Sequence, residues 1–172
     1  MKLITLSILF STFAFSNCEP IVYDESRGEK YLVVGISDGD SISIVDSNKK
    51  TERVRLATID APEMGQAFGK ASKQSLSQMI YKKHVQVIVK NRDRYGRMVG
   101  EVYIGELNAN VEQLRRGMAW HYRRHAGEQS RADRILYEEV ERSARKRNAG
   151  LWKDDDPTPP WDYRKKNPRN DR

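Results

Sequence analysis

The sequence predicts an α+β fold in which a β-meander leads to a helix, two further strands and two C-terminal helices. Short runs of alternating polar and apolar residues, typical of half-buried strands, recur between residues 31 and 104. Helical periodicity appears at 68–81 and again after residue 131. The length of 172 residues corresponds to one domain with terminal segments.

The first third of the domain predicts three antiparallel strands, at 31–36, 41–45 and 51–59. The first is apolar and β-rich and ends at an Asp-Gly turn, and the second alternates polar and apolar residues. A polar hairpin loop at 46–50 leads to the third strand. There Val54 and Leu56 are expected to face inward, so Arg55 faces the opposite side.

The remainder of the domain alternates helices and strands. We expect a helix at about 68–81, strands at 84–90 and 97–104, a short helix that ends near Gly117, and a longer helix at 132–148. Ile135, Leu136 and Val140 are expected on the apolar side of the long helix. Gly150 is expected as its C-terminal stop.

The two ends of the chain predict segments outside the domain. Lys2, the uncharged apolar run that follows it and Ala14-Phe15-Ser16 are typical of a signal peptide at 1–16, too short to cross a bilayer as a helix. Residues 17–30 form a polar leader, and 154–172 are expected as a flexible, proline-rich charged tail. We predict no transmembrane segment and an extracytoplasmic location, secreted or periplasmic.

Cys18 is the only cysteine, so no disulfide within the chain can form. A thiol just after a signal segment can be a lipid-attachment site, although Phe15-Ser16-Asn17-Cys18 matches that signal poorly. A soluble protein with a spare thiol and a lipoprotein anchored through Cys18 both stay open.

The overall charge favours an anionic partner. With 31 Lys and Arg against 24 Asp and Glu, the formal net charge is +7 and the isoelectric point is about 9.5. This balance is typical of proteins that bind nucleic acid or an anionic membrane surface, and it also occurs as a simple solvated surface.

Three short motifs combine carboxylates and arginines. They are Asp38-Gly39-Asp40-Ser41, the segment from Arg55 to Glu63 that ends in Asp60-Ala61-Pro62-Glu63, and Asp93-Arg94-Tyr95-Gly96-Arg97. Each alone is equally consistent with ordinary turn chemistry. Within them, three carboxylates can hold a hard cation and activate water, and two guanidiniums can bind a phosphate: Asp40, Asp60 and Glu63, and Arg55 and Arg97.

The order and spacing of these motifs resemble the staphylococcal (micrococcal) nuclease family. That family has Asp-Gly-Asp-Thr, then Arg five residues before Asp-x-Pro-Glu, then Asp-Lys/Arg-Tyr-Gly-Arg. The match extends from about Tyr31 to Trp152 and includes Gly-Leu-Trp at 150–152. It implies a nuclease domain at 31–153 with a five-stranded OB-type barrel, one helix between strands 3 and 4 and two C-terminal helices.

The resemblance also implies a site and a reaction. Glu63 would be the general base, with Arg55 and Arg97 on the phosphate. Arg94 and Tyr95 would place the adjoining phosphate. The Ca²⁺ ligands would be the side chains of Asp40 and Asp60 and the carbonyl of Ala61. The implied protein is a monomer without a stable protein partner that cleaves DNA and RNA internally, without sequence specificity, to leave 3′-phosphate ends.

The sequence differs from the family pattern at three places. Ser41 replaces the usual threonine and keeps a hydroxyl, and Ala61 replaces a common threonine where the family uses the backbone carbonyl. Where the staphylococcal enzyme has a tyrosine pair, this chain continues after Trp120 with a basic stretch, so Arg123 and Arg124 are candidate phosphate contacts. Non-catalytic nucleic-acid binding and lipid binding are the alternative functions. The complete set of carboxylates and arginines favours the enzyme over the first, and the absence of a basic amphipathic helix argues against the second.

Overall fold

The computed structural model describes residues 21–124 and 129–168, so the expected signal peptide and Cys18 lie outside the described residues. Its strands are β1 (Lys30–Ile36), β2 (Ser41–Val45), β3 (Thr51–Leu56), β4 (Ile59–Asp60), β5 (His84–Arg92), β6 (Met98–Ile104), β7 (Leu107–Asn108) and β8 (Trp120–His121). Its helices are η1 (Glu25–Arg27), α1 (Gly69–Ile80), α2 (Ala109–Arg115), α3 (Arg131–Lys146), η3 (Gly150–Lys153) and α4 (Pro160–Lys166).

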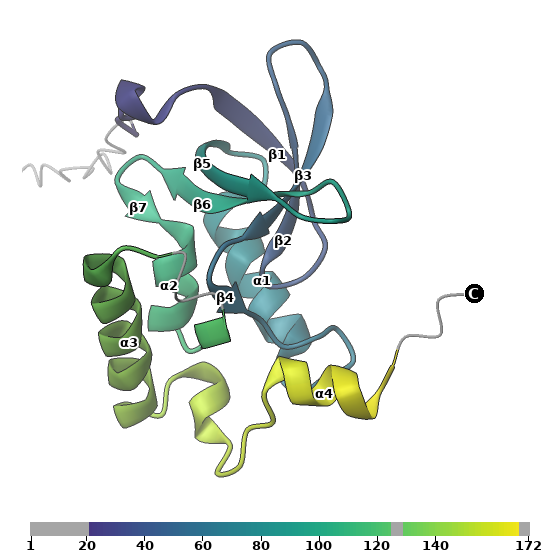
Figure 1. The fold of residues 1–172 in the computed structure, drawn as a ribbon, viewed down its shortest axis with the longest axis vertical. Helices are drawn as coiled ribbons and strands as arrows, with labels where there is room; N and C mark the ends of the chain where they lie inside the picture. Colours follow the sequence, from purple (N-terminus) through teal and green to yellow (C-terminus); the bar gives the residue numbers. More distant parts are fainter. Residues whose placement is uncertain (1–20, 125–128, 169–172) are drawn as a thin grey trace, which may run out of the picture.

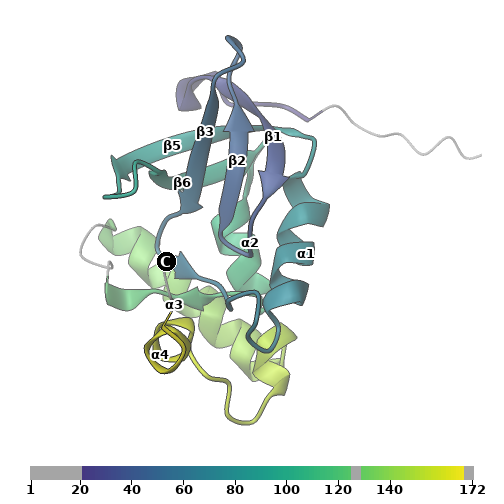
Figure 2. The same cartoon turned by 90° about the vertical axis from the view of Figure 1, so that its right-hand side faces the viewer.

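Five strands close into a barrel, which confirms the predicted α+β fold of the OB type. The sheet order is β3-β2-β1-β5-β6, and β3 also pairs in parallel with β6, where Val54 lies opposite Met98. Figure 1 shows the barrel above the C-terminal helices, and Figure 2 shows α1 against its side. Alternating apolar residues fill the interior, among them Val33, Ile42, Ile44, Val54, Leu56, Val85 and Val102.

The third strand ends earlier than the sequence predicts. β3 stops at Leu56, and Thr58 adopts a left-handed backbone with φ +60°, which a regular strand cannot accommodate. The chain then continues as β4, where Asp60 pairs with Trp120 of β8. The predicted continuous strand to residue 59 was therefore wrong at Ala57 and Thr58, which form a turn, and Ile59 and Asp60 belong to β4, outside the barrel sheet.

The long helix α3 buries a different side from the one predicted. Ile135 and Leu136 are each 44% exposed, whereas Tyr137, Glu141 and Ala144 are buried. Glu141 is fixed there because its carboxylate accepts a hydrogen bond from the backbone N–H of His121, at 3.1 Å. Val140 does pack against the core, as expected. This polar contact, and not the number of apolar residues on each side, determines which side of α3 is buried.

The segment expected as a flexible tail instead contains helix α4. Pro159 and Pro160 begin the helix, Asp162 lies in its first turn, and three cations occupy its last turn. Trp161 packs edge-on against Trp120, with ring centroids 5.7 Å apart. The end of the chain is therefore folded onto the domain through at least residue 166. No helix in residues 21–124 and 129–168 has the length and apolar character needed to cross a bilayer.

Candidate active site

The turn between β1 and β2 places Asp40 at the rim of the barrel. The backbone N–H of Asp40 donates to Asp38 Oδ1 at 3.0 Å, and Gln113 of α2 donates to the carbonyl of Gly39 at 2.8 Å. A side chain at Gly39 would meet the hydroxyl of Ser72 at 1.8 Å. Glycine is required because helix α1 lies directly on this turn, and the close packing fixes the direction of Asp40.

Arg55 links the first two sequence motifs. Its guanidinium donates to Asp40 Oδ1 at 2.6 Å and to Asp60 Oδ1 at 2.9 Å. Ser41 lies directly opposite Arg55 across the β2–β3 ladder, so strand pairing alone brings the arginine beside Asp40. The backbone N–H of Ala61 donates to Asp40 Oδ2 at 2.9 Å. Asp40, Arg55, Asp60 and Ala61 therefore form one cluster, as the sequence predicts.

Two carboxylates of this cluster are almost completely removed from solvent. Asp60 is 0% exposed and Asp40 is 2% exposed. Burial raises the pKa of Asp60, and the hydrogen bond from Arg164 opposes that shift. The Asp40 carboxylate raises the pKa of the Arg55 guanidinium, which stays positively charged. Burial and the neighbouring Asp40 together raise the pKa of Asp38 to about 6.

This donor set fits a hard divalent cation. Carboxylate and carbonyl oxygens are the ligands that Ca²⁺ takes. Throughout the described residues there is no group of three or more His, Cys, Asp or Glu side chains arranged to hold a metal. The site thus offers two carboxylates and the Ala61 peptide, and it has no arrangement suited to a zinc-binding cluster.

Glu63 lies beside the cluster on the loop that follows Pro62. Its side chain is 18% exposed, and Glu63 Oε1 accepts a hydrogen bond from Arg164 Nη1 at 3.0 Å. The same nitrogen donates to Asp60 Oδ1 at 3.1 Å. A partly exposed carboxylate next to buried anions is well placed to accept a proton from water.

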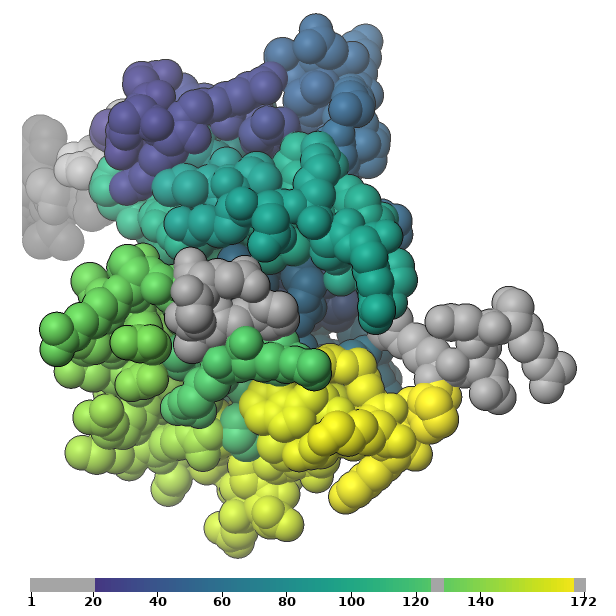
Figure 3. All heavy atoms as spheres, in the orientation of Figure 1, coloured from purple at the N-terminus to yellow at the C-terminus, as the bar shows by residue number. Residues whose placement is uncertain are grey.

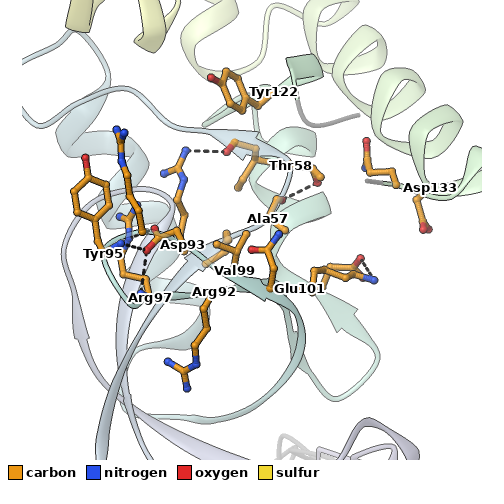
Figure 4. Close-up of a pocket in the computed structure, with 17 residues that line it drawn as sticks. Ala57, Thr58, Arg92, Asp93, Tyr95, Arg97, Val99, Glu101, Tyr122 and Asp133 are labelled. Carbon is orange, nitrogen blue, oxygen red and sulfur yellow. Dashed lines mark hydrogen bonds and ion pairs between the residues drawn. The ribbon is translucent and has the colours of Figure 1, made fainter. Parts of the chain in front are cut away.

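The third motif lines a cavity of about 480 Å³ that opens beside the cluster. Arg55, Arg94, Tyr95 and Arg97 all contribute to its wall, and Tyr122 lines it as well. Figure 4 shows Tyr95 and Arg97 on one wall and Tyr122 across the cavity. Arg97 is held in place because its Nε donates to Asp93 Oδ2 at 2.7 Å. Cationic and aromatic side chains around one opening suit phosphate and base contacts.

The comparisons with known proteins identify the family. Residues 53–154 match the family model described as "Staphylococcal nuclease homologue". The chain belongs to the staphylococcal nuclease family. It is 43% identical over 148 residues to a protein named "Micrococcal nuclease" from Shigella flexneri, with 81% of this chain and 80% of the relative covered.

Two further relatives agree with this assignment. An "Uncharacterized endonuclease" from Haemophilus influenzae is 39% identical over 133 residues, covering 77% of this chain and 71% of the relative. Another protein with the same description, from Escherichia coli O157:H7, is 42% identical over 133 residues, covering 77% of this chain and 82% of the relative. As a member of the staphylococcal nuclease family, the chain is a hydrolytic nuclease with nucleic-acid substrates.

Within this staphylococcal nuclease fold, the two arginines after Trp120 do not lie on the cavity. Arg123 donates to Glu141 Oε2 at 2.8 Å and turns toward α3, and Arg124 is exposed. Neither residue is among those that line the cavity. From the same stretch of chain, Tyr122 does line the cavity, and it packs against Trp161 with ring centroids 5.5 Å apart. Sequence reasoning passed over this tyrosine because its arginine neighbours carried the charge.

Arg164 is the other site residue that sequence reasoning missed. It lies on α4, in the segment that was expected to be a flexible tail. The signal was present in the sequence, since two prolines before an acidic first turn and a basic last turn are typical of a helix. The segment was discounted because it contains no apolar period.

Proposed function

We propose that this staphylococcal nuclease homologue is a Ca²⁺-dependent endonuclease that hydrolyses DNA and RNA without sequence specificity and leaves 3′-phosphate ends. One observation carries the proposal. Arg55 forms ion pairs with two buried carboxylates, Asp40 and Asp60, at the edge of a cavity that Arg97 also lines. The members of this set come from a single chain, which supports a monomer as the active unit.

Asp40, Asp60 and the carbonyl of Ala61 would hold Ca²⁺. When bound, Ca²⁺ would supply positive charge against the phosphate oxygens of the substrate. The side chain of Asp40 is held in a fixed orientation for this role. Its Oδ1 accepts a hydrogen bond from Arg55, and its Oδ2 accepts one from the backbone N–H of Ala61. Hydrogen bonds of this kind orient the ligands of metal sites.

Glu63 would take a proton from the attacking water, whose oxygen forms the new bond to phosphorus. The bond from phosphorus to the 5′-oxygen breaks on the opposite side, and that oxygen takes up a proton from solvent, which leaves a 3′-phosphate and a 5′-hydroxyl. Arg55 and Arg97 would bind the equatorial oxygens, where negative charge increases in the transition state. Arg94, Tyr95 and Tyr122 would hold the neighbouring nucleotide, and their phosphate and stacking contacts would read no base edges.

Digestion of unrelated DNA and RNA fragments, first with Ca²⁺ and then with EGTA, tests this function. We expect acid-soluble nucleotides from both substrates with Ca²⁺, and their loss with EGTA, because removal of the cation takes away the positive charge that would face the phosphate oxygens. The products should resist extension by a DNA polymerase until a phosphatase removes the 3′-phosphate. Equal activity in EGTA, or products that are extended directly, would contradict the proposal.

We also propose that the mature protein acts outside the cytoplasm. The proposal rests on Lys2, the apolar run and Ala14-Phe15-Ser16, together with the hazard that an unspecific nuclease presents to intracellular nucleic acid. Mass spectrometry of the protein from its host should show a chain that begins at Asn17, or at a lipid-modified Cys18. Recovery of the uncleaved chain from the cytosol would contradict export.

A further inference from the structure

The C-terminal helix α4 brings a third arginine to the site. Arg164 Nη2 donates to Asp60 Oδ2 at 2.7 Å, and Arg164 Nη1 donates to Asp60 Oδ1 at 3.1 Å and to Glu63 Oε1 at 3.0 Å. The guanidinium thus binds both oxygens of Asp60 and reaches Glu63 at the same time. Its residue number lies beyond the region 53–154 that matches the family model.

Several contacts hold α4 in this position. Pro160 is buried, and Trp161 packs against both Trp120 and Tyr122. The side chain of Gln66 donates to the carbonyl of Thr158 at 2.6 Å. Figures 2 and 3 show α4 in yellow beneath the barrel, and the space-filling view of Figure 3 shows a hollow between this segment and the teal strands above it. The helix is therefore docked on the rim of the site by contacts that do not involve Arg164.

The loop that bears Glu63 is joined to the same segment. The backbone N–H of Glu63 donates to Gln66 Oε1 at 3.1 Å, while the amide of Gln66 holds Thr158. The C-terminal segment thus holds Glu63 in two ways. Gln66 links the backbone of Glu63 to Thr158, and Arg164 binds the carboxylate of Glu63. The carboxylates of Asp60 and Glu63 carry like charges and contact the same guanidinium, which holds them in a fixed arrangement.

We propose that Arg164 is a positioning residue of the nuclease reaction, which holds the carboxylate of Glu63 beside Asp60 in the orientation needed to accept a proton. This inference rests on the proposed role of Glu63 as the base. It makes α4 part of the active unit of the enzyme and places the functional end of the domain beyond the matched family region.

Substitution of Arg164 tests the proposal by separating turnover from binding. Arg164→Ala is expected to lower kcat by about 10–100-fold, the usual cost of losing a residue that orients site carboxylates, with little change in KM. Arg164→Lys should recover part of the loss, since it restores the charge without the planar fork. Lys165→Ala is the matched control, because Lys165 is the next cation on α4 and pairs only locally, with Asp162. Circular dichroism should show the same fold in each variant.

A double-mutant cycle decides whether Arg164 acts through Glu63. In a Glu63→Gln background, Arg164→Ala should have little further effect on kcat, because the group that Arg164 positions is already disabled. A full, additive loss in that background would overturn the proposal. An increase in activity on Arg164→Ala would also overturn it, because α4 would then be a cover that obstructs the site.

Calorimetric titration of Ca²⁺ gives a readout that does not depend on turnover. Arg164→Ala should bind Ca²⁺ several-fold more tightly than the wild-type chain, because a positive charge beside Asp60 opposes a second cation. An unchanged affinity would show that Arg164 does not contact Asp60 in solution and would overturn the proposal. If the wild-type chain proved inactive on nucleic acid, the proposed function would fail, whereas this titration would still report the place of Arg164.

Discussion

Glu63→Gln is expected to lower kcat by about 10²–10⁴-fold, the range that general-base assistance contributes. The amide keeps the size of the carboxylate and can still contact Arg164, but it has no proton affinity at neutral pH. Glu63 is not among the proposed Ca²⁺ ligands, so binding of Ca²⁺ and of oligonucleotide should be retained. Single-turnover cleavage and equilibrium binding, measured on the same preparation, check the two parts separately.

The matched control for this prediction is Glu106→Gln. Glu106 is an exposed carboxylate that pairs with Arg27 and is not among the residues that line the cavity, so its substitution should leave turnover unchanged. A fully active Glu63→Gln enzyme would remove Glu63 from the role of base. Loss of oligonucleotide binding in this variant would instead show that Glu63 supports the substrate-binding surface.

The parts of the site that could be predicted from the sequence are those set by strand pairing and short turns. Asp40 ends the turn before β2, and the residue after it, Ser41, lies opposite Arg55 in the β2–β3 hairpin. The contact between Asp40 and Arg55 therefore follows from the register of this hairpin. The turn from Asp93 to Arg97 is equally local, since Asp93 binds the side chain of Arg97 four residues later. Local spacing in the sequence was therefore enough to predict these contacts, which involve residues of the proposed chemistry.

The features that could not be predicted depend on contacts between distant segments. The left-handed Thr58, which ends β3 early, is supported by the pairing of β4 with β8 some sixty residues later. Arg123 has the charge of a phosphate ligand, but the buried Glu141 on α3 attracts it. Charge alone did not indicate which arginine would pair with a carboxylate of the domain and which would line the cavity.

The C-terminal segment illustrates the same limit most clearly. Its composition, rich in proline and charge, favours an unfolded tail. Trp161 of α4 packs against the aromatic rings of Trp120 and Tyr122. No local sequence pattern predicts this contact, because the partners lie about forty residues earlier in the chain. This aromatic contact orders the short helix together with the buried Pro160 and the hydrogen bond from Gln66 to the carbonyl of Thr158, and Arg164 adds its ion pair to Asp60.

Arg97→Lys is expected to lower kcat/KM by about 10²–10³-fold, the cost of removing one preorganised donor to a developing oxyanion. Arg97 lines the cavity, and Asp93 holds its Nε, so the guanidinium plane has a fixed direction. Lysine keeps the positive charge but loses the planar fork, so long-range attraction of nucleic acid should persist while transition-state stabilisation is lost. The loss should therefore appear in kcat, with a smaller change in oligonucleotide affinity.

Arg116→Lys provides the control for this substitution, because Arg116 also forms an ion pair within four residues, with Glu112, but lies on α2 away from the cavity. If both variants lost activity to the same small extent, Arg97 would be a general cation and not a donor to the transferred phosphate. If Arg97→Lys lost affinity and turnover in equal measure, its contact would form in the ground state as well. A selective loss of turnover is the result that the fixed guanidinium predicts, since only a donor already aligned with the reacting phosphate gains strength as charge develops there.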